Sequence, residues 1–362
     1  MFWETGFPKI KTINMQPINT ALCSFGMSGW VFHAPFISVD PHFNLYAVVE
    51  RSKNLAEEKY PGVKIFRTLE EMLADNAIEL VIVNTPNYTH YEFAKKALLA
   101  NKHVVVEKPF TATVEEAEEL IELAKKQNKK LSVYQNRRYD SDYKTIKKIL
   151  EEKLLGDLAE AEFHFDRYTE NIGTKLHKET PGPGTGSLYD LGSHLIDQAL
   201  QLFGMPDAVF ADIRIIRPVS KVDDYFDLLL YYPKLRVRIK SSYLVREPLP
   251  GYILHGFKGS FIKPKTNIQE ELLQANKVPG KPDWGIEPES ERGLLHTEKD
   301  GKVIKEYISS ERGNYGDYYN GVYEAIRNDK PVPVSAEDGL KVIKIIEAAV
   351  KSSNEKKVVE IK

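Results

Sequence analysis

The chain has 362 residues, of which 42% are hydrophobic and 28% charged, and its formal net charge is −2. This composition is typical of a globular protein with room for two domains, and it gives no electrostatic reason to expect nucleic acid or an anionic membrane as a partner. No apolar run is long enough to span a bilayer. A single cysteine, Cys23, excludes an internal disulfide, so we expect a reducing, cytoplasmic location.

The chain divides into two halves of different pattern. Residues 1–17 lack the continuous apolar core of a signal peptide, and we interpret them as a tail. Across 18–137, segments of helical periodicity separate short apolar runs at 20–25, 44–49, 80–83, 104–106 and 131–134. Repeated strand–helix units predict a parallel sheet with helices on both faces. Two of the helices begin with Thr-x-x-Glu capping sequences, at Thr68 and Thr113.

The pattern changes from residue 138 to 362. Apolar and polar residues alternate over 159–166, and further strands are expected at 209–216, 226–232, 236–240 and 253–257. Few helices separate these strands, so the sheet is predicted to be antiparallel or mixed. Helices are expected at 143–153, 317–327 and 336–350, with an irregular excursion at 276–293. The exposed face of this sheet is a candidate subunit contact.

The first strand is followed by a glycine-containing turn at 24–29 that opens a helix. This is the context that a dinucleotide-binding fingerprint requires. Gly26 lets the backbone approach a pyrophosphate, Gly29 lets the helix pack close to the strand, and the helix N-terminus supplies amides for the phosphate charge. The first glycine of the usual pattern is replaced by Ser24, and a plain strand–helix turn is the alternative. The candidate cofactor-binding residues are Ser24, Gly26, Met27, Ser28 and Gly29.

The second strand ends in a charged cluster, Glu50-Arg51-Ser52-Lys53. An acid at this distance from the fingerprint binds the adenosine ribose hydroxyls, which favours NAD. Arg51 with its neighbours can instead hold a 2′-phosphate, which favours NADP. The cofactor is thus NAD or NADP, with a slight preference for NAD, unless the cluster is merely solvated.

Polar residues also follow the later strands of this half. The carboxyl ends of parallel strands face the ligand crevice. Thr85, Asn87 and His90 are candidates for the ribose or nicotinamide end of the cofactor, although Asn87 can simply cap a helix and His90 can be a structural histidine.

Glu107 and Lys108 follow three valines and precede Pro109, which ends the strand. They form either a strand-end ion pair or part of a site. Tyr134, Asn136 and Arg137 follow the last strand and belong either to a substrate site or to an interdomain hinge.

A glycine-rich turn at 181–186 leads into a helix that carries Asp190 and His194, four residues apart and among leucines. This pair is either a structural element of the core or a general base whose charge a carboxylate tunes. Asp197, one turn further, is an alternative partner for His194. With no further cluster of metal-ligating residues, metal binding is the weaker interpretation, and no metal is expected.

In this order and spacing, the motifs resemble the glucose–fructose oxidoreductase, inositol dehydrogenase and MocA family, from about residue 20 to the C-terminus. The resemblance rests on the 24–29 turn, Thr85-Pro86 with His90, Glu107-Lys108-Pro109 and Asp190-x-x-x-His194. The sequence segments at 31–35 and 134–138 are similar to those of the NADP-dependent scyllo-inositol dehydrogenase branch.

The resemblance implies an N-terminal Rossmann domain, a C-terminal α+β domain with a large open sheet, and an active site between them. It implies hydride transfer between NAD or NADP and a hydroxyl-bearing carbon of a sugar or cyclitol. Lys108 corresponds to the active-site lysine, His194 to the general base and Asp190 to the acid that tunes it. A cis peptide before Pro109 is also implied.

Further expectations concern the substrate, the assembly and other functions of the scaffold. Asn136 and Arg137 are expected to bind substrate hydroxyls, and a homodimer or homotetramer is expected to form through the C-terminal sheet. The alternatives on the same scaffold are a non-catalytic nucleotide-binding sensor, a redox-neutral glycoside-cleaving enzyme with tightly bound NAD, and reduction of a non-sugar substrate.

Overall fold

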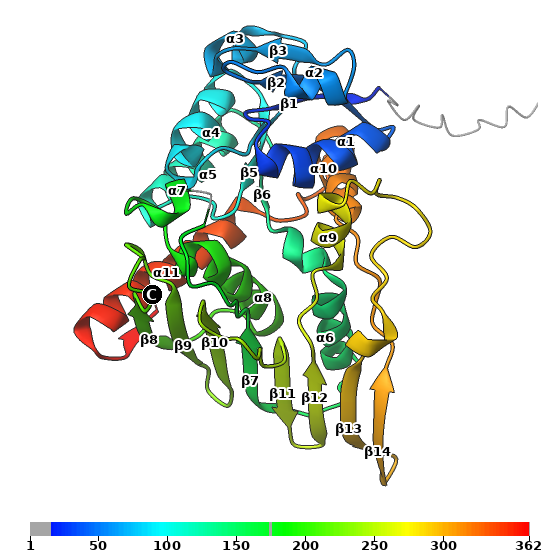
Figure 1. Ribbon diagram of the computed structural model, residues 1–362, viewed down its shortest axis with the longest axis vertical. Helices are drawn as coiled ribbons and strands as arrows, with labels where there is room; N and C mark the ends of the chain where they lie inside the picture. The colour runs from blue at the N-terminus through cyan, green and yellow to red at the C-terminus, as the bar shows by residue number, and fades with distance from the viewer. Residues whose placement is uncertain (1–15, 174–175, 362) are drawn as a thin grey trace, which may run out of the picture.

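The computed structural model describes residues 16–173 and 176–361 and contains two sheets, one in each half of the chain (Figure 1). Residues 1–15 of the expected tail lie outside the described residues. Within the described part of the chain, no helix is both long and apolar enough to cross a membrane.

The first sheet is parallel and has the strand order β3-β2-β1-β4-β5-β6. Its strands are β1 Ile18–Leu22, β2 Phe43–Val49, β3 Lys64–Phe66, β4 Leu80–Val83, β5 His103–Glu107 and β6 Leu131–Tyr134. The order reverses between β1 and β4, so a ligand crevice is expected at the carboxyl ends of these strands. The parallel sheet is as predicted, except that β3 was not anticipated because it is only three residues long.

Helices connect these strands. They are η1 Ser28–His33, α1 Ala34–Val39, α2 Leu55–Lys59, α3 Leu69–Ala74, η2 Asn87–Thr89, α4 His90–Leu99 and α5 Val114–Lys126. The capping box at Thr68 is complete, with both reciprocal hydrogen bonds. At Thr113 only half of the box forms, because the Glu116 carboxylate accepts a hydrogen bond from the amide of Ala112 instead.

The second sheet has nine strands in the order β14-β13-β12-β11-β7-β10-β9-β8-β15. The strands are β7 Leu158–His164, β8 Ala208–Arg214, β9 Tyr225–Tyr231, β10 Arg236–Ser242, β11 Tyr252–Gly256, β12 Gly259–Lys263, β13 Gly293–Lys299, β14 Lys302–Ile308 and β15 Val359–Glu360. Only β7 and β10 pair in parallel, which confirms the prediction of a large, mainly antiparallel sheet. Strands β12 to β14 were not expected, since charged residues and glycines interrupt their apolar pattern.

Helices cover one face of this sheet. The helical elements of the second half are η3 Asn136–Tyr139, α6 Ser141–Glu151, α7 Leu176–Glu179, η4 Leu188–Gly192, α8 Ser193–Phe203, α9 Ile268–Gln274, η5 Glu289–Glu291, α10 Gly316–Asn328 and α11 Ala336–Glu355. Helices α8 and α11 pack their apolar sides on the sheet and share its core. The opposite face carries the alternate, partly exposed side chains of β8, β9 and β10.

Helix α10 packs on the first sheet although it lies late in the sequence (Figure 1). Its Tyr318 and Tyr319 are fully buried in one core with Phe36 of α1 and Tyr134 of β6. The expected division at residue 137 therefore separates the two sheets, whereas the core of the N-terminal domain also includes residues of the second half.

Candidate active site

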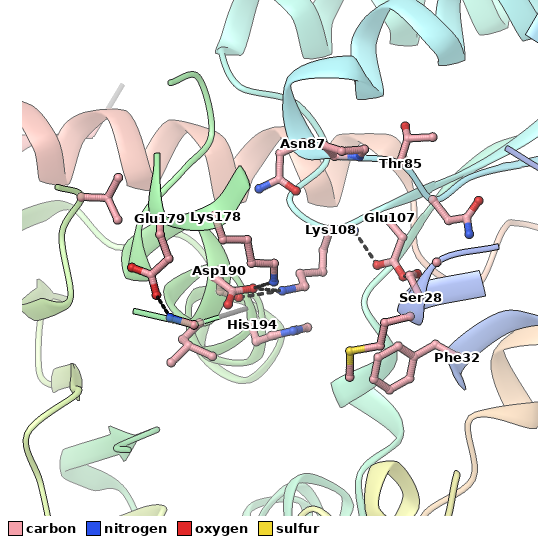
Figure 2. Close-up of a pocket in the computed structure, with 18 of the residues that line it drawn as sticks. Ser28, Phe32, Thr85, Asn87, Glu107, Lys108, Lys178, Glu179, Asp190 and His194 are labelled. Atoms are coloured by element: carbon pink, nitrogen blue, oxygen red, sulfur yellow. Dashed lines mark hydrogen bonds and ion pairs between the residues drawn. The ribbon is translucent and has the colours of Figure 1, made fainter. Parts of the chain in front are cut away.

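A cavity of about 630 Å³ lies between the carboxyl ends of β1, β4 and β5 and the segment η4–α8 (Figure 2). Residues from both halves of the chain line it. Those predicted from the sequence are Ser24, Gly26, Met27, Ser28, Thr85, Asn87, His90, Glu107, Lys108, Asn136, Arg137, Asp190 and His194. Most of the predicted site residues thus meet in one place, while Gly29, Glu50, Arg51 and Tyr134 do not line the cavity.

The turn after β1 has the form of a phosphate cradle. Ser24 is joined to Asn84 at the end of β4 by three hydrogen bonds of 2.9–3.0 Å, so the serine in place of the usual glycine does not disturb the turn. A Cβ at Gly29 would lie 2.4 Å from the Ser24 carbonyl oxygen, so only glycine fits there. A Cβ at Gly26 would meet nothing within 4 Å, and the space above it is open to a ligand. This arrangement fits the pyrophosphate of a dinucleotide.

In the charged cluster after β2, the acid is bound within the domain and the neighbouring basic residue is exposed. Glu50 is buried, and its carboxylate accepts a hydrogen bond of 2.9 Å from the amide of Ala56 in α2. Its carbonyl oxygen accepts a second one from Arg67. Glu50 is therefore engaged within the domain, and Arg51 is the exposed charge next to it.

The residues after β4 line the cavity and also hold its walls. Asn87 does not cap a helix; its amide donates to the carbonyl oxygen of Gly184 in the glycine-rich turn at 2.6 Å, and so links the two halves of the chain. His90 is fully buried, and its ring nitrogens lie 2.8 and 3.0 Å from the carbonyl oxygens of Pro109 and Thr85. Burial lowers the pKa of His90. His90 is thus a satisfied histidine that positions the loops around it.

Glu107 and Lys108 do not form an ion pair with each other. The Glu107 carboxylate accepts hydrogen bonds from the Ser28 hydroxyl and from His33 Nε2, the latter at 2.9 Å. His33 Nδ1 in turn lies 2.6 Å from the hydroxyl of Tyr319. Burial by itself raises the pKa of Glu107, but His33, Ser28 and Lys108 outweigh it and hold the pKa at about 2. An ionised Glu107 therefore fixes the cofactor turn to the end of β5.

Lys108 extends from β5 across the cavity to η4 (Figure 2). Its Nζ donates to the carbonyl oxygen of Asp190 at 2.7 Å and to Oδ1 of the same residue at 2.9 Å. The Lys108–Pro109 peptide is cis, as the family resemblance implied. Burial lowers the pKa of Lys108; the Asp190 charge opposes this effect and the Lys178 charge adds to it.

Asp190 is held by two lysines and not by His194. Lys178 of α7 also reaches Oδ1 of Asp190, at 2.6 Å. Burial raises the pKa of Asp190, but the charges of Lys108, Lys178 and Arg167 outweigh it and keep the pKa well below the usual value. Asp190 thus makes its hydrogen bonds to the lysines and not to His194, while its charge still raises the pKa of His194 through space.

His194 is buried beside Lys108, and its Nδ1 has no hydrogen-bond partner among the described residues. The alternative partner, Asp197, is taken by Arg138, with two hydrogen bonds of 2.6 and 2.7 Å. Burial and the charges of Lys108 and Arg137 place the pKa of His194 well below 6.5, against the opposing charge of Asp190. The imidazole is therefore neutral at physiological pH and free to accept a proton.

The residues after β6 differ in whether they line the cavity. Asn136 lines the cavity. Arg137 also lines it, but its guanidinium is bound to Asp140 at 3.1 Å and to Glu270 at 2.7 Å, which limits its use for substrate hydroxyls. Tyr134 is 1% exposed, and its hydroxyl donates to the carbonyl oxygen of Phe32, so its predicted contact with substrate is corrected to a place in the aromatic core.

Several cavity residues were missed by the sequence analysis. They are Arg167, Lys178, Glu179, Arg217, Tyr243 and Glu270. All lie in α7, in α9 or just outside the strands of the second sheet, where neither spacing nor periodicity distinguishes them from solvated charges. A signal in the sequence existed only for Lys178 and Glu179, which lie close before the glycine-rich turn.

The parallel sheet, the open Gly26 turn and a lysine and a neutral histidine facing one cavity define a two-domain, nicotinamide-dinucleotide-dependent oxidoreductase. The comparisons agree. Residues 18–135 match the model of the oxidoreductase family NAD-binding Rossmann fold, and residues 147–361 match that of the family's C-terminal alpha/beta domain. The chain belongs to the glucose–fructose oxidoreductase, inositol dehydrogenase and MocA family, and it is an NAD(P)-dependent dehydrogenase.

Relatives resemble the chain over nearly its whole length. The scyllo-inositol 2-dehydrogenase (NADP(+)) IolW of Bacillus subtilis is 40% identical over 345 residues, 95% of this chain and 96% of that protein. The crystal structure of an oxidoreductase from Bacteroides fragilis is 51% identical, with a TM-score of 0.88, over 95% of this chain and 100% of that one. The structure of the oxidoreductase yvaA from B. subtilis has a TM-score of 0.93 at 39% identity, over 96% and 99% of the two chains.

Proposed function

We propose that this protein transfers hydride between a nicotinamide cofactor and a hydroxyl-bearing carbon of a sugar or cyclitol. The observation that carries the proposal is the position of Lys108 and His194, which line the same cavity as the Gly26 turn. The relative IolW, a scyllo-inositol 2-dehydrogenase, supports this substrate class.

Each side chain has a part in this reaction. His194, neutral in its buried setting, accepts the proton of the substrate hydroxyl. Lys108 donates a hydrogen bond to the reacting oxygen and stabilises its developing negative charge. Asp190 holds the lysine in place through its carboxylate and its carbonyl oxygen. A bound nicotinamide ring supplies the hydride acceptor.

The first test is turnover of Lys108→Ala and His194→Ala. We expect each variant to lose about 10²- to 10⁴-fold in kcat, the range typical of a general acid or base, while the circular dichroism spectrum is retained. The measurement is nicotinamide absorbance with a panel of cyclitols and aldoses. Lys125→Ala and His296→Ala, both exposed and outside the cavity, are the matched controls.

Near-normal turnover in both active-site variants would overturn the assignment. Wild-type protein that binds nucleotide but stays silent across the panel would instead indicate a sensor or a substrate outside the polyols. Nicotinamide cofactor that co-purifies and does not exchange would favour a redox-neutral reaction.

We further propose that the preferred cofactor is NADP, although Glu50 in the sequence slightly favours NAD. The carboxylate of Glu50 is committed to the amide of Ala56 and is buried, so it is poorly placed for ribose hydroxyls. Arg51, Ser52 and Lys53 are exposed beside it and can meet a 2′-phosphate. The NADP dependence of the relative IolW supports the same choice.

Replacing Arg51 by Gln tests this preference. Loss of a charge-assisted hydrogen bond costs about 1.5–3 kcal/mol, so KM for NADP should rise about 10- to 100-fold. KM for NAD should change little, since NAD has no 2′-phosphate. The control is Arg292→Gln, because Arg292 is ion-paired with Glu289 and lies far along the chain from the cofactor site. Equal changes for both cofactors, or a wild-type preference for NAD, would contradict the proposal.

A further inference from the structure

Positive and negative side chains both line the substrate side of the cavity, and most of the positive ones are paired with described acids. The cations that line the cavity are Lys108, Arg137, Lys178, Arg217 and Arg167. Arg137 is paired with Glu270 and Asp140. Arg217 is paired with Asp224 at 2.8 Å and with Glu179 at 3.1 Å.

Lys108 and Lys178 share a single carboxylate oxygen, Oδ1 of Asp190 (Figure 2). Arg167 adds a third positive charge that acts on the same carboxylate. Asp223 and Glu270 also line the cavity, and the charge of Arg167 acts on Glu270 as well. Glu179, the nearest other acid on α7, is bound to Arg217 and to the amide of Gly173. Its carboxylate is therefore already engaged.

Among these cations, Arg167 is the one that makes no direct ion pair with an acid of the described residues. Across residues 16–173 and 176–361, its guanidinium makes no hydrogen bond or ion pair, and it lies near two aromatic rings. Its Cζ lies 5.5 Å from the ring centroid of Phe165 and 5.8 Å from that of Tyr243. Its backbone is fixed, since its amide donates to Ser242 and its carbonyl oxygen accepts from Val245. The backbone of Arg167 is therefore held in place, while its guanidinium has donors available for a ligand.

We propose that Arg167, assisted by Lys178, binds a carboxylate or phosphate group of the substrate, so that the substrate is an acidic sugar or cyclitol derivative. The inference rests on the proposed function and names its substrate class. A guanidinium offers two parallel N–H donors to a carboxylate or phosphate, and flanking rings hold its plane in position. The pyrophosphate of the cofactor is expected at the Gly26 turn, in the other half of the chain, so it does not account for Arg167.

The experiment compares matched neutral and acidic substrates, with the full-length protein and NADP. Glucose is compared with glucuronate and glucose 6-phosphate, and myo-inositol with an inositol monophosphate, in the wild type, Arg167→Gln and Arg167→Lys. Wild-type kcat/KM should be about 10- to 100-fold higher for the acidic member of a pair, the range for a charge-assisted hydrogen bond. The glucuronate and phosphate arms show which anion fits.

In Arg167→Gln this preference should disappear through KM, so that kcat/KM for the acidic member of each pair falls to the level of its neutral partner. Arg167→Lys should retain part of it, because the charge remains but the paired donors are lost. Arg292→Gln is the matched control outside the cavity. A wild type without acidic preference, or an Arg167→Gln variant that loses neutral and acidic substrates equally, would overturn the inference.

A direct binding measurement separates this inference from the proposed reaction. Calorimetric titration of glucuronate and glucose 6-phosphate into the wild type and Arg167→Gln requires no turnover. If no polyol is oxidised but acidic sugars bind and lose affinity only in Arg167→Gln, the anion site stands and the proposed reaction fails. If polyols are oxidised but neither acidic sugar binds the wild type, the reaction stands and the anion site fails.

Discussion

Two lysines from opposite sides of the cavity meet at one oxygen of Asp190, and this contact shapes the chemistry of the whole site. Lys108 comes from the end of β5 and Lys178 from α7, seventy residues later. A helical Asp-x-x-x-His spacing suggested that the acid would serve the histidine. The lysines hydrogen-bond the carboxylate of Asp190, and its charge raises the pKa of His194 through space.

The pH profile of kcat/KM for polyol oxidation follows from these charges. His194 must be neutral to accept a proton, and its pKa lies well below 6.5, so activity should fall on the acid side only well below pH 6.5. Lys108 must be protonated to donate, and burial lowers its pKa, so the alkaline fall should lie below pH 10.5.

Two variants should move the alkaline limb in opposite directions. Lys178→Gln removes a positive charge that lowers the pKa of Lys108, so its alkaline limb should move to higher pH. Asp190→Asn removes a negative charge that raises the pKa values of both Lys108 and His194, so both of its limbs should move to lower pH. Steady-state kinetics across pH for the three proteins checks this. Limbs that coincide, or that move together, would contradict the described arrangement.

At the scale of elements, the turn between β1 and η1 separates two uses of glycine. Gly29 faces the Ser24 carbonyl oxygen and the Asn84 side chain, at 2.4 and 2.8 Å from an added Cβ. Gly26 faces open space, and its backbone is not in the left-handed region. Gly29 is therefore needed to pack the helix against the strand, and Gly26 is needed only when a ligand approaches.

Alanine at these two positions should give different defects. Gly29→Ala should lose about 1–3 kcal/mol in the free energy of unfolding, because the added methyl group overpacks the turn. Gly26→Ala should stay within about 0.5 kcal/mol of the wild type in stability but bind NADPH about 10-fold or more weakly. Urea unfolding and NADPH fluorescence titration measure the two effects. Wild-type NADPH affinity in Gly26→Ala would show that the turn does not cradle the cofactor.

For the whole molecule, we propose that two copies associate through the open face of the second sheet. Phe210 of β8, Leu229 of β9 and Arg238 of β10 are neighbours on this face, opposite the side that α11 covers. Phe210 is 38% exposed there, and on β14 of the same sheet Val303 and Tyr307 are also exposed. An open sheet with exposed apolar side chains is typical of a subunit interface.

Phe210→Asp should weaken that association without unfolding the chain, because a charge in a desolvated contact is costly whereas the same residue is partly exposed in the single chain. Light scattering after size exclusion should show a multiple of 41.3 kDa for the wild type and a shift toward 41.3 kDa for the variant. Leu99→Asp, on an exposed position of α4, is the control. An unchanged mass in Phe210→Asp would place the interface elsewhere.

Local pattern predicted a large part of the fold. The buried strands of the first sheet are short apolar runs, and β7 to β11 alternate or are apolar enough to be found, because burial on one or both faces fixes the side-chain pattern directly. Strand β3 escaped detection because it has only three residues, and β12 to β14 because charged residues and glycines interrupt their apolar pattern. The late return of α10 to the first core also has no local signal.

The sequence by itself determined most of the elements, the glycine turn, Lys108 at the end of its strand and His194 one turn from Asp190. These features depend on neighbours within a few residues, where backbone geometry fixes the spacing. Only the tertiary structure decided the partners: Lys178 on Asp190, Ala56 on Glu50, Arg138 on Asp197, and no described partner for Arg167. Charged side chains are long and pair across segments far apart in sequence, so their partners depend on how the two sheets are packed together.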